Sequence, residues 1–139
     1  MTARALAPLA LAVALATGGC VHYPTVLEAG GTMVRPDKGR AVRAADSVQV
    51  YFELKSSGKY GDVITGVHTP VAREAVLVDG QGQTVSRLEV PGATVMVFDA
   101  KGPHVVLREL TRPLIVGDTI IITLVFEKVG GLGIIGVVE

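Results

Sequence analysis

The sequence predicts an all-β domain, a Greek-key β-sandwich or barrel of about eight short strands. Runs rich in valine, isoleucine and threonine recur at close spacing through most of the chain. Several of them alternate in polarity, as in Ser47-Val48-Gln49-Val50-Tyr51, and this alternation is typical of a strand with one solvent-exposed face. Turn-forming sequences separate the runs, and no stretch has the period of an amphipathic helix.

The expected strands are, in chain order, Ser47–Leu54, Asp62–Val67, Glu74–Val78, Thr84–Val90, Thr94–Phe98, His104–Leu110, Asp118–Glu127 and Leu132–Val138. The turns between them read SSGKYG, DGQGQ, VPGA, DAKGP and VGG. The last two strands are apolar and strongly β-branched, so we expect them to form a buried hairpin. Membrane contact is the alternative for this apolar run, but Glu127 and Lys128 interrupt it midway.

The composition limits which classes of protein this chain can belong to. The 139 residues suffice for one domain with a core of its own. With no tryptophan, three tyrosines and three phenylalanines, aliphatic side chains must supply most of the packing. Lysine and arginine together number 13, as do aspartate and glutamate, and no basic stripe is present. Because nucleic-acid binding requires clustered cations, nucleic acid is not an expected partner.

The first 19 residues have the layout of a secretory signal peptide: Arg4, an Ala/Leu-rich stretch, then three small residues. The apolar part is too short to span the ~30 Å core of a bilayer as a helix. The only cysteine, Cys20, follows in the stretch ATGGC, which resembles a bacterial lipobox with Thr17 where leucine is usual. We therefore expect lipid attachment at Cys20 and an extracytoplasmic location on a bacterial membrane, in the periplasm or cell envelope. A plain signal peptide with an incidental cysteine is the alternative.

This interpretation divides the chain into a signal peptide (1–19), a lipidated cysteine and tether (20–32) and a β-sandwich domain (33–139). His22 lies in the tether, where an exposed linker histidine is expected. Lipidation also removes Cys20 from the possible metal ligands and nucleophiles, so the mature protein would have neither a free thiol nor a disulfide.

Several short motifs occur in a characteristic order along the domain. They are Met33-Val34-Arg35-Pro36, the turn Ser56-Ser57-Gly58, the corner Thr69-Pro70-Val71-Ala72, and the segment VPGATVMVFDAKGPHVVLRELTRPLIVGDTIIITLVFEKVG. Their order and spacing, over roughly residues 33 to 138, resemble those of the periplasmic copper chaperones of the PCu(A)C family. The resemblance implies a cupredoxin-like β-sandwich. It also implies an activity, which is to hold Cu(I) outside the cytoplasm and pass it to the binuclear copper site of cytochrome oxidase.

The ligands that the resemblance implies are a His or Met in an early hairpin, a Met on its return strand and a later His-x-Met pair, donors that suit the soft ion Cu(I). The pair falls on His104-Val105-Val106, so the histidine is present and the methionine is a valine. The early histidine falls near Leu77, and the return-strand methionine near Val85 or Leu88. Residues 69–95 contain no His, Met or Cys. Most of the implied metal ligands are therefore missing.

The mature chain offers other donors that could replace them, namely His22, Met33, His68, Met96 and His104. A substitute site could combine His68, Met96 and His104, but nothing in their spacing favours it, and filling the core is the default use of a lone methionine. A blue-copper centre needs a cysteine ligand and structural zinc needs about four N/S ligands, and the chain supplies neither set. No nucleophile elbow or phosphate-binding loop is present, so the sequence predicts no enzyme.

Two hypotheses follow. In the first, the protein is a membrane-anchored lipoprotein whose PCu(A)C-like domain has largely lost its metal site, needs no cofactor and acts through contacts with other proteins. The partner would be an envelope protein or the respiratory oxidase assembly, and a sheet edge or the loop end around His104 would make the contact. In the alternative, the protein is a copper chaperone that binds Cu(I) through a non-standard site and delivers it to cytochrome oxidase.

Overall fold

The computed structural model describes residues 33–139, so the predicted signal peptide, Cys20, His22 and the tether lie outside the described residues. In this part of the chain, no helix is long and apolar enough to cross a membrane. The strands are β1 (Val34–Arg43), β2 (Val48–Ser56), β3 (Asp62–His68), β4 (Ala72–Val78), β5 (Thr84–Val85), β6 (Leu88–Val90), β7 (Thr94–Phe98), β8 (His104–Leu110), β9 (Thr119–Phe126) and β10 (Gly130–Val138). The predicted all-β class is confirmed.

Two strand predictions were wrong. The sequence pattern missed β1, because five of its ten residues are charged and only Val34 and Ala41 are buried. The predicted strand Thr84–Val90 is two strands, because the chain crosses at Ser86-Arg87 from β5, which pairs with β4, to β6, which pairs with β3. Neither the charged strand β1 nor the crossing between β5 and β6 leaves a period-two pattern of polarity in the sequence.

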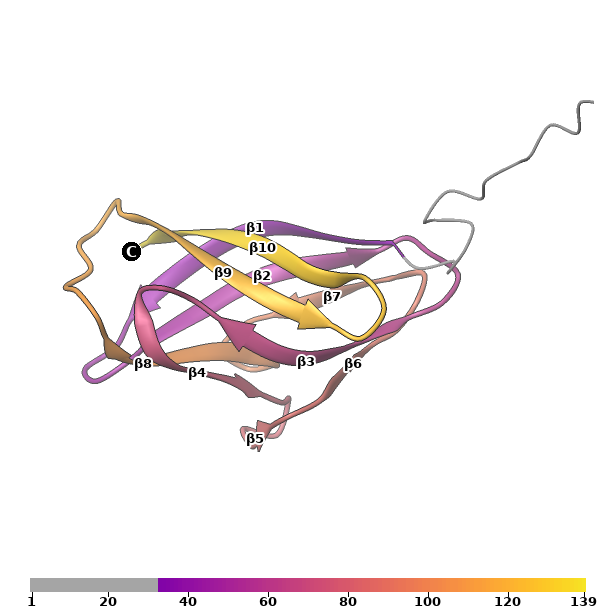
Figure 1. Ribbon diagram of the computed structural model, residues 1–139, viewed down its shortest axis with the longest axis horizontal. Coiled ribbons are helices and arrows are strands. Elements are labelled where there is room, and N and C mark those ends of the chain that lie inside the picture. The colour runs from indigo at the N-terminus through magenta and orange to yellow at the C-terminus, as the bar shows by residue number, and fades with distance from the viewer. Residues whose placement is uncertain (1–32) are drawn as a thin grey trace, which may run out of the picture.

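The strands form one sheet in the order β5-β4-β8-β2-β1-β10-β9-β3-β6, and β7 also pairs with β2. The sheet curls around a single core, so that β3 and β4, far apart in this order, come back into contact (Figure 1). The core is aliphatic apart from Phe52, Phe98 and Phe126. Phe52 and Phe98 stack with ring centroids 4.2 Å apart, and both are almost fully buried.

The junction between β1 and β10, the one parallel pairing between the described strands, depends on a glycine. Here Arg40 lies opposite Val137 and Ala41 opposite Val138. A β-bulge between Asp37 and Arg40 brings Gly39 so close to β10 that a Cβ on it would overlap the carbonyl oxygen of Ile135. Only glycine allows this close approach of β1 to β10, and the pairing of these two strands joins the two halves of the sheet.

The predicted hairpin of the last two strands is present, with β9 and β10 antiparallel over their full length. The prediction that it is buried was wrong for one face. Ile120, Ile122 and Leu124 point into the core, whereas Ile121 and Ile135 lie on the outer face and are more than half exposed. The side-chain period of two in a strand places only alternate residues in the core.

Candidate functional site

His104 lies at a break in a long strand. Strands β7 and β8 lie end to end along the same edge of β2, since β7 pairs with its residues 52–56 and β8 with its residues 48–50. The loop between them is closed by Asp99, whose Oδ1 accepts hydrogen bonds from the amides of Lys101 (3.0 Å) and Gly102 (2.7 Å). The amide of Asp99 donates to the carbonyl of Pro103 (3.1 Å). His104 therefore follows a well-defined turn.

The imidazole of His104 points away from the core. Its neighbours along β8, Val105 and Leu107, are fully buried, so His104 and Val106 occupy the opposite face. Nδ1 of His104 lies 3.0 Å from the carbonyl oxygen of Gly102. A carbonyl can only accept, so Nδ1 carries the proton and Nε2 of the neutral ring keeps its lone pair. This is how metal-binding imidazoles are usually held.

Among residues 33–139, the surroundings of His104 offer no second soft donor. Across the strands it faces Val78 on β4, and its ring meets the Tyr51 ring edge-on at a centroid distance of 6.0 Å. The guanidinium of Arg40 covers the Tyr51 ring at 5.3 Å, and the Tyr51 hydroxyl donates to Gln49. These neighbours supply apolar carbon, a phenol, an amide and a cation, none of which suits Cu(I).

The positions where the resemblance implies further ligands are apolar and packed. Leu77 is buried and pairs with both Val105 and Val85 across the neighbouring strands. Val85 and Leu88 pack against the core, and Val106 is itself buried. The side chains at the positions where the resemblance implies metal ligands therefore serve as hydrophobic packing in this chain.

The structure separates the three residues proposed as a substitute site. Met96 pairs with the fully buried Leu54 and packs against the core, on the face of the sheet opposite to His104. His68 ends β3, lies opposite Thr123 and lines a groove of about 310 Å³ between β3 and β4. It precedes the corner that begins β4, whereas His104 pairs with the last residue of β4. Within residues 33–139, no group of three or more His, Cys, Asp or Glu side chains is arranged to hold a metal ion.

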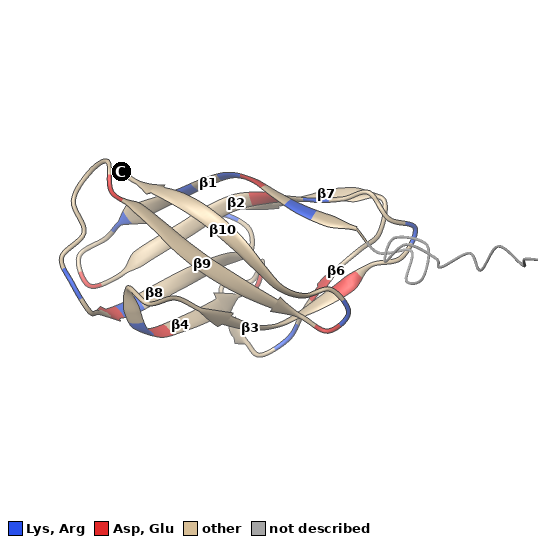
Figure 2. Cartoon of the chain, turned by 45° about the horizontal axis from the view of Figure 1, so that its top comes forward, with Lys and Arg blue, Asp and Glu red and all other residues tan. Residues whose placement is uncertain are grey.

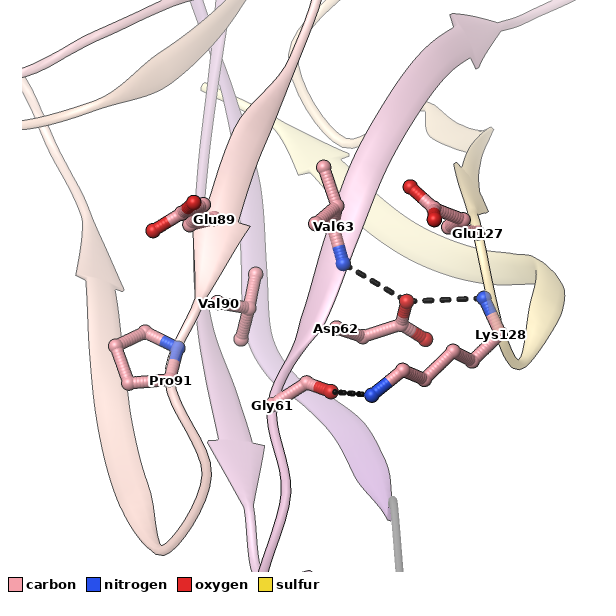
Figure 3. Close-up of a pocket in the computed structure, with 8 residues that line it drawn as sticks. All are labelled: Gly61, Asp62, Val63, Glu89, Val90, Pro91, Glu127 and Lys128. Atoms are coloured by element: carbon pink, nitrogen blue, oxygen red, sulfur yellow. Dashed lines mark hydrogen bonds between the residues drawn. The ribbon is translucent and has the colours of Figure 1, made fainter. Parts of the chain in front are cut away.

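Asp62 is the one buried carboxylate among the described residues, and the sequence analysis did not single it out. Its Oδ1 accepts hydrogen bonds from the amides of Val63 (2.8 Å) and Lys128 (2.9 Å), and Oδ2 accepts one from the amide of Val129 (3.0 Å). Figure 3 shows this carboxylate between β3 and the turn that follows β9, with the Lys128 ammonium donating to the carbonyl of Gly61 (3.0 Å).

The pocket beside Asp62 has a volume of about 270 Å³, and Glu89, Val90, Pro91 and Glu127 also line it (Figure 3). Glu127 forms an ion pair with Arg87 at 2.7 Å. Because the lone pairs of Asp62 are directed to backbone amides, this carboxylate holds the β9–β10 turn onto β3. We assign it a structural role. No local sequence signal could have revealed it, since two of its three partners, Lys128 and Val129, lie 66 and 67 residues away.

The shifted pKa values belong to surface ion pairs. The hydrogen bond that Lys55 donates to Asp37, and then the one from the amide of Lys38, lower the pKa of Asp37, and the bond to Asp37 raises the pKa of Lys55. The hydrogen bond from the amide of Ile115 lowers the pKa of Asp118, and Arg112 adds to this effect. Asp37 and Lys55 are exposed and Asp118 is partly exposed, so the shifts mark strand and loop contacts and give no sign of acid–base catalysis.

Known proteins match this chain in two ways. A lipoprotein family described as LpqE-like matches residues 21–134, while a search of the curated proteins found no match.

The copper-bound PCuAC domain from PmoF2 is similar in structure, with a TM-score of 0.68 at 22% identity over 76% of this chain and 92% of that one. The apo PCuAC domain from PmoF1 has a TM-score of 0.70 at 20% identity over the same shares. Cu(I)-bound DR1885 from Deinococcus radiodurans has a TM-score of 0.64 at 25% identity over 88% of this chain and 83% of that one. The cupredoxin-like β-sandwich and the resemblance to PCu(A)C domains are confirmed.

Proposed function

The chain belongs to the LpqE-like lipoprotein family and has a PCu(A)C-like, copper-chaperone-type domain, and on this basis we propose that it is a lipid-anchored extracytoplasmic protein that acts through protein contacts. In this proposal the domain keeps the fold of the copper chaperones, while most of the metal site has been lost. The relatives are copper-binding domains rather than enzymes, in agreement with the absence of catalytic motifs from the sequence.

One observation carries the proposal: His104 remains in place, but its neighbours are hydrophobic. Val78 and Val106 flank it on the outer face, and Leu77 and Val85 are packed on or against the core. A single imidazole gives no chelation, so it cannot hold Cu(I) tightly without a second donor. The contact surface would be the end of the domain around the loop 99–103, and the partner an envelope protein or an oxidase assembly.

The anchor is supported by the family match, which begins at residue 21, directly after Cys20. A diacylglyceryl group on the Cys20 sulfur, with a tether of about twelve residues, would hold the domain close to the membrane surface.

The second hypothesis is a chaperone that binds Cu(I) through a non-standard site. It is favoured by the orientation of His104, whose Nε2 keeps a lone pair while Nδ1 donates to Gly102. Another donor would have to come from outside the described residues or from a partner.

A Cu(I) titration against a competing chelator separates the two hypotheses. We expect the chain from Val21 onward to release Cu(I) to the chelator, because no residue between 33 and 139 gives His104 a second soft donor. The variant Val106→Met restores the His-x-Met pair and is expected to bind Cu(I) more tightly than the wild type. The control His68→Ala should behave as the wild type does. Stoichiometric binding by the wild type, lost in His104→Ala and kept in His68→Ala, would overturn the proposal and establish the chaperone.

The anchor is tested by mass spectrometry of protein extracted from membranes. We expect the mature chain to begin at Cys20 and to carry the mass of a diacylglyceryl group. The variant Cys20→Ala should lose both the lipid and retention in the membrane fraction. A mature chain that begins elsewhere, or an unmodified Cys20, would contradict lipid anchoring.

A further inference from the structure

The outer face of the β9–β10 hairpin is unusually apolar. Ile121 and Ile135 are direct cross-strand partners on this face, and Val137 lies next to them along β10. The loop before β9 adds Ile115 and Val116 at the same end. Hydrogen bonds from the amide of Gly117 to the carbonyl of Val138 (2.9 Å) and from the amide of Val138 to the carbonyl of Asp118 (2.8 Å) tie this loop to the hairpin. The five side chains, which we call the hairpin patch, are between 47% and 65% exposed: Ile115, Val116, Ile121, Ile135 and Val137.

Several other strands of the sheet carry ion pairs on their outer face, and this hairpin does not. Strands β9 and β10 contain no Asp, Glu, Lys or Arg, and Figure 2 shows both without blue or red along their length. By contrast, β1 and β2 are joined across their exposed side by Lys38–Glu53 and Lys55–Asp37, and β4 and β8 by Arg108–Glu74. An exposed apolar patch of several hundred Å² with no charge inside it marks an interaction surface.

The size of the hairpin patch fits an interface between two protein chains. Its side chains together present on the order of 500 Å² of apolar surface, within the range that marks interaction sites. A standard interface buries about 800 Å² per partner, and about 65% of a homodimer interface is apolar. The hairpin patch therefore supplies roughly the apolar area that one side of a homodimer needs.

The outer face of the hairpin is also complementary in shape to the same face of a second copy. Beyond the hairpin patch, towards the turn, the outer positions of β10 are Gly131 and Gly133, which lie opposite Val125 and Thr123. A Cβ on Gly133 would meet only a methyl group of Ile121, at 4.0 Å, so the surface there is open and shallow. If two copies stack antiparallel about a twofold axis, the bulky end of each hairpin covers the glycine end of the other.

We propose that two copies of this chain associate face to face through the outer surface of the β9–β10 hairpin. This inference goes beyond the proposed function and uses neither His104 nor the anchor. A second copy fits better than a lipid surface, because strands β9 and β10 carry none of the Trp, Tyr, Lys or Arg side chains that typically mark contact with a membrane interface, and Lys128 in the turn between them donates to the carbonyl of Gly61.

Cross-linking of the full chain in membranes tests the proposal. A cysteine introduced at Thr123, near the centre of the hairpin, faces its counterpart across sheets about 10 Å apart, which a short bis-maleimide can span. We expect Thr123→Cys to give a cross-linked dimer, and Val97→Cys, at an exposed position on β7, to give none. The wild-type chain, whose only cysteine is Cys20, is the control for cross-linking through that residue.

Two further substitutions in the Thr123→Cys chain test the packing. Ile135→Lys places a charge in the hairpin patch, and Gly133→Val fills the shallow end, and each is expected to lower the dimer yield about tenfold. Gly133→Val should leave the melting temperature unchanged or raise it, because the position is open and valine favours strands. The matched control Val97→Lys should leave the yield unchanged.

Three outcomes would overturn the proposal. The first is no dimer from Thr123→Cys, and the second is equal yields from Thr123→Cys and Val97→Cys. The third is labelling of Thr123→Cys by a bilayer-confined reagent in place of cross-linking, which would assign the face to the membrane. If Cys20 proves to be unmodified, the Cys20→Ala chain in solution gives the same comparison, so failure of the anchor and failure of the dimer remain distinguishable.

Discussion

Replacing Phe52 by alanine is expected to lower the free energy of unfolding by about 4 kcal/mol. The Phe52 ring stacks on Phe98 at 4.2 Å, with 18° between the ring planes. The truncation removes apolar contacts and leaves a cavity beside Phe98 that the neighbouring strands cannot fill. Since small domains are stable by about 5–15 kcal/mol, this loss would leave the fold marginal. Denaturant-induced unfolding at equilibrium measures it.

The matched control is Val95→Ala on β7, the strand that pairs with this part of β2. Val95 is about half exposed, so its truncation should change the free energy of unfolding by less than about 0.5 kcal/mol. A loss below about 1 kcal/mol for Phe52→Ala would show that the stacked pair is not the centre of the core.

Replacing Asp62 by alanine is expected to destabilise the domain by about 3 kcal/mol. The change leaves the amides of Val63, Lys128 and Val129 without their acceptor, and each unsatisfied buried donor costs about 1–3 kcal/mol before water enters. The adjacent pocket admits water, so the total should fall well below the sum of the separate costs. Thermal unfolding gives the loss, and hydrogen exchange of the Lys128 and Val129 amides should become faster.

Two variants make this test specific. Asp62→Asn keeps one acceptor oxygen and turns an amide group towards a backbone donor, so an intermediate loss is expected. Glu89→Ala, in the exposed wall of the same pocket, should be close to neutral. If Asp62→Ala were as stable as Glu89→Ala, the carboxylate would have no structural role.

In our proposal, the domain has kept the fold while its metal site at the His104 end was lost. The strands on which the resemblance implies metal ligands are required for the core, whereas a ligand side chain can be exchanged for valine or leucine without loss of packing. The hydrogen bond from His104 to Gly102 fixes the turn before β8 whether or not a metal binds. Under the proposed loss of the metal site, this local role gives a reason for the histidine to remain.

The sequence predicted most of the strands and the missing donors, since these depend on local patterns. Alternation of polarity and the turn residues placed β2, β3, β4, β7, β8, β9 and β10 within a few residues of their observed bounds. Strand β1 escaped prediction because it is mostly charged and is held by the approach of Gly39 to β10, a contact with the other end of the chain.

By itself, the sequence determined the all-β class, the resemblance to PCu(A)C domains and the absence of His, Met and Cys from residues 69–95. Only the tertiary structure decided that Met96 and His104 lie on opposite faces of the sheet, that Asp62 holds the β9–β10 turn, and that one face of the hairpin stays uncovered. The physical reason is the same in each case. A residue's type and its near neighbours set which local structure forms, but strand pairing between distant segments sets what each side chain meets.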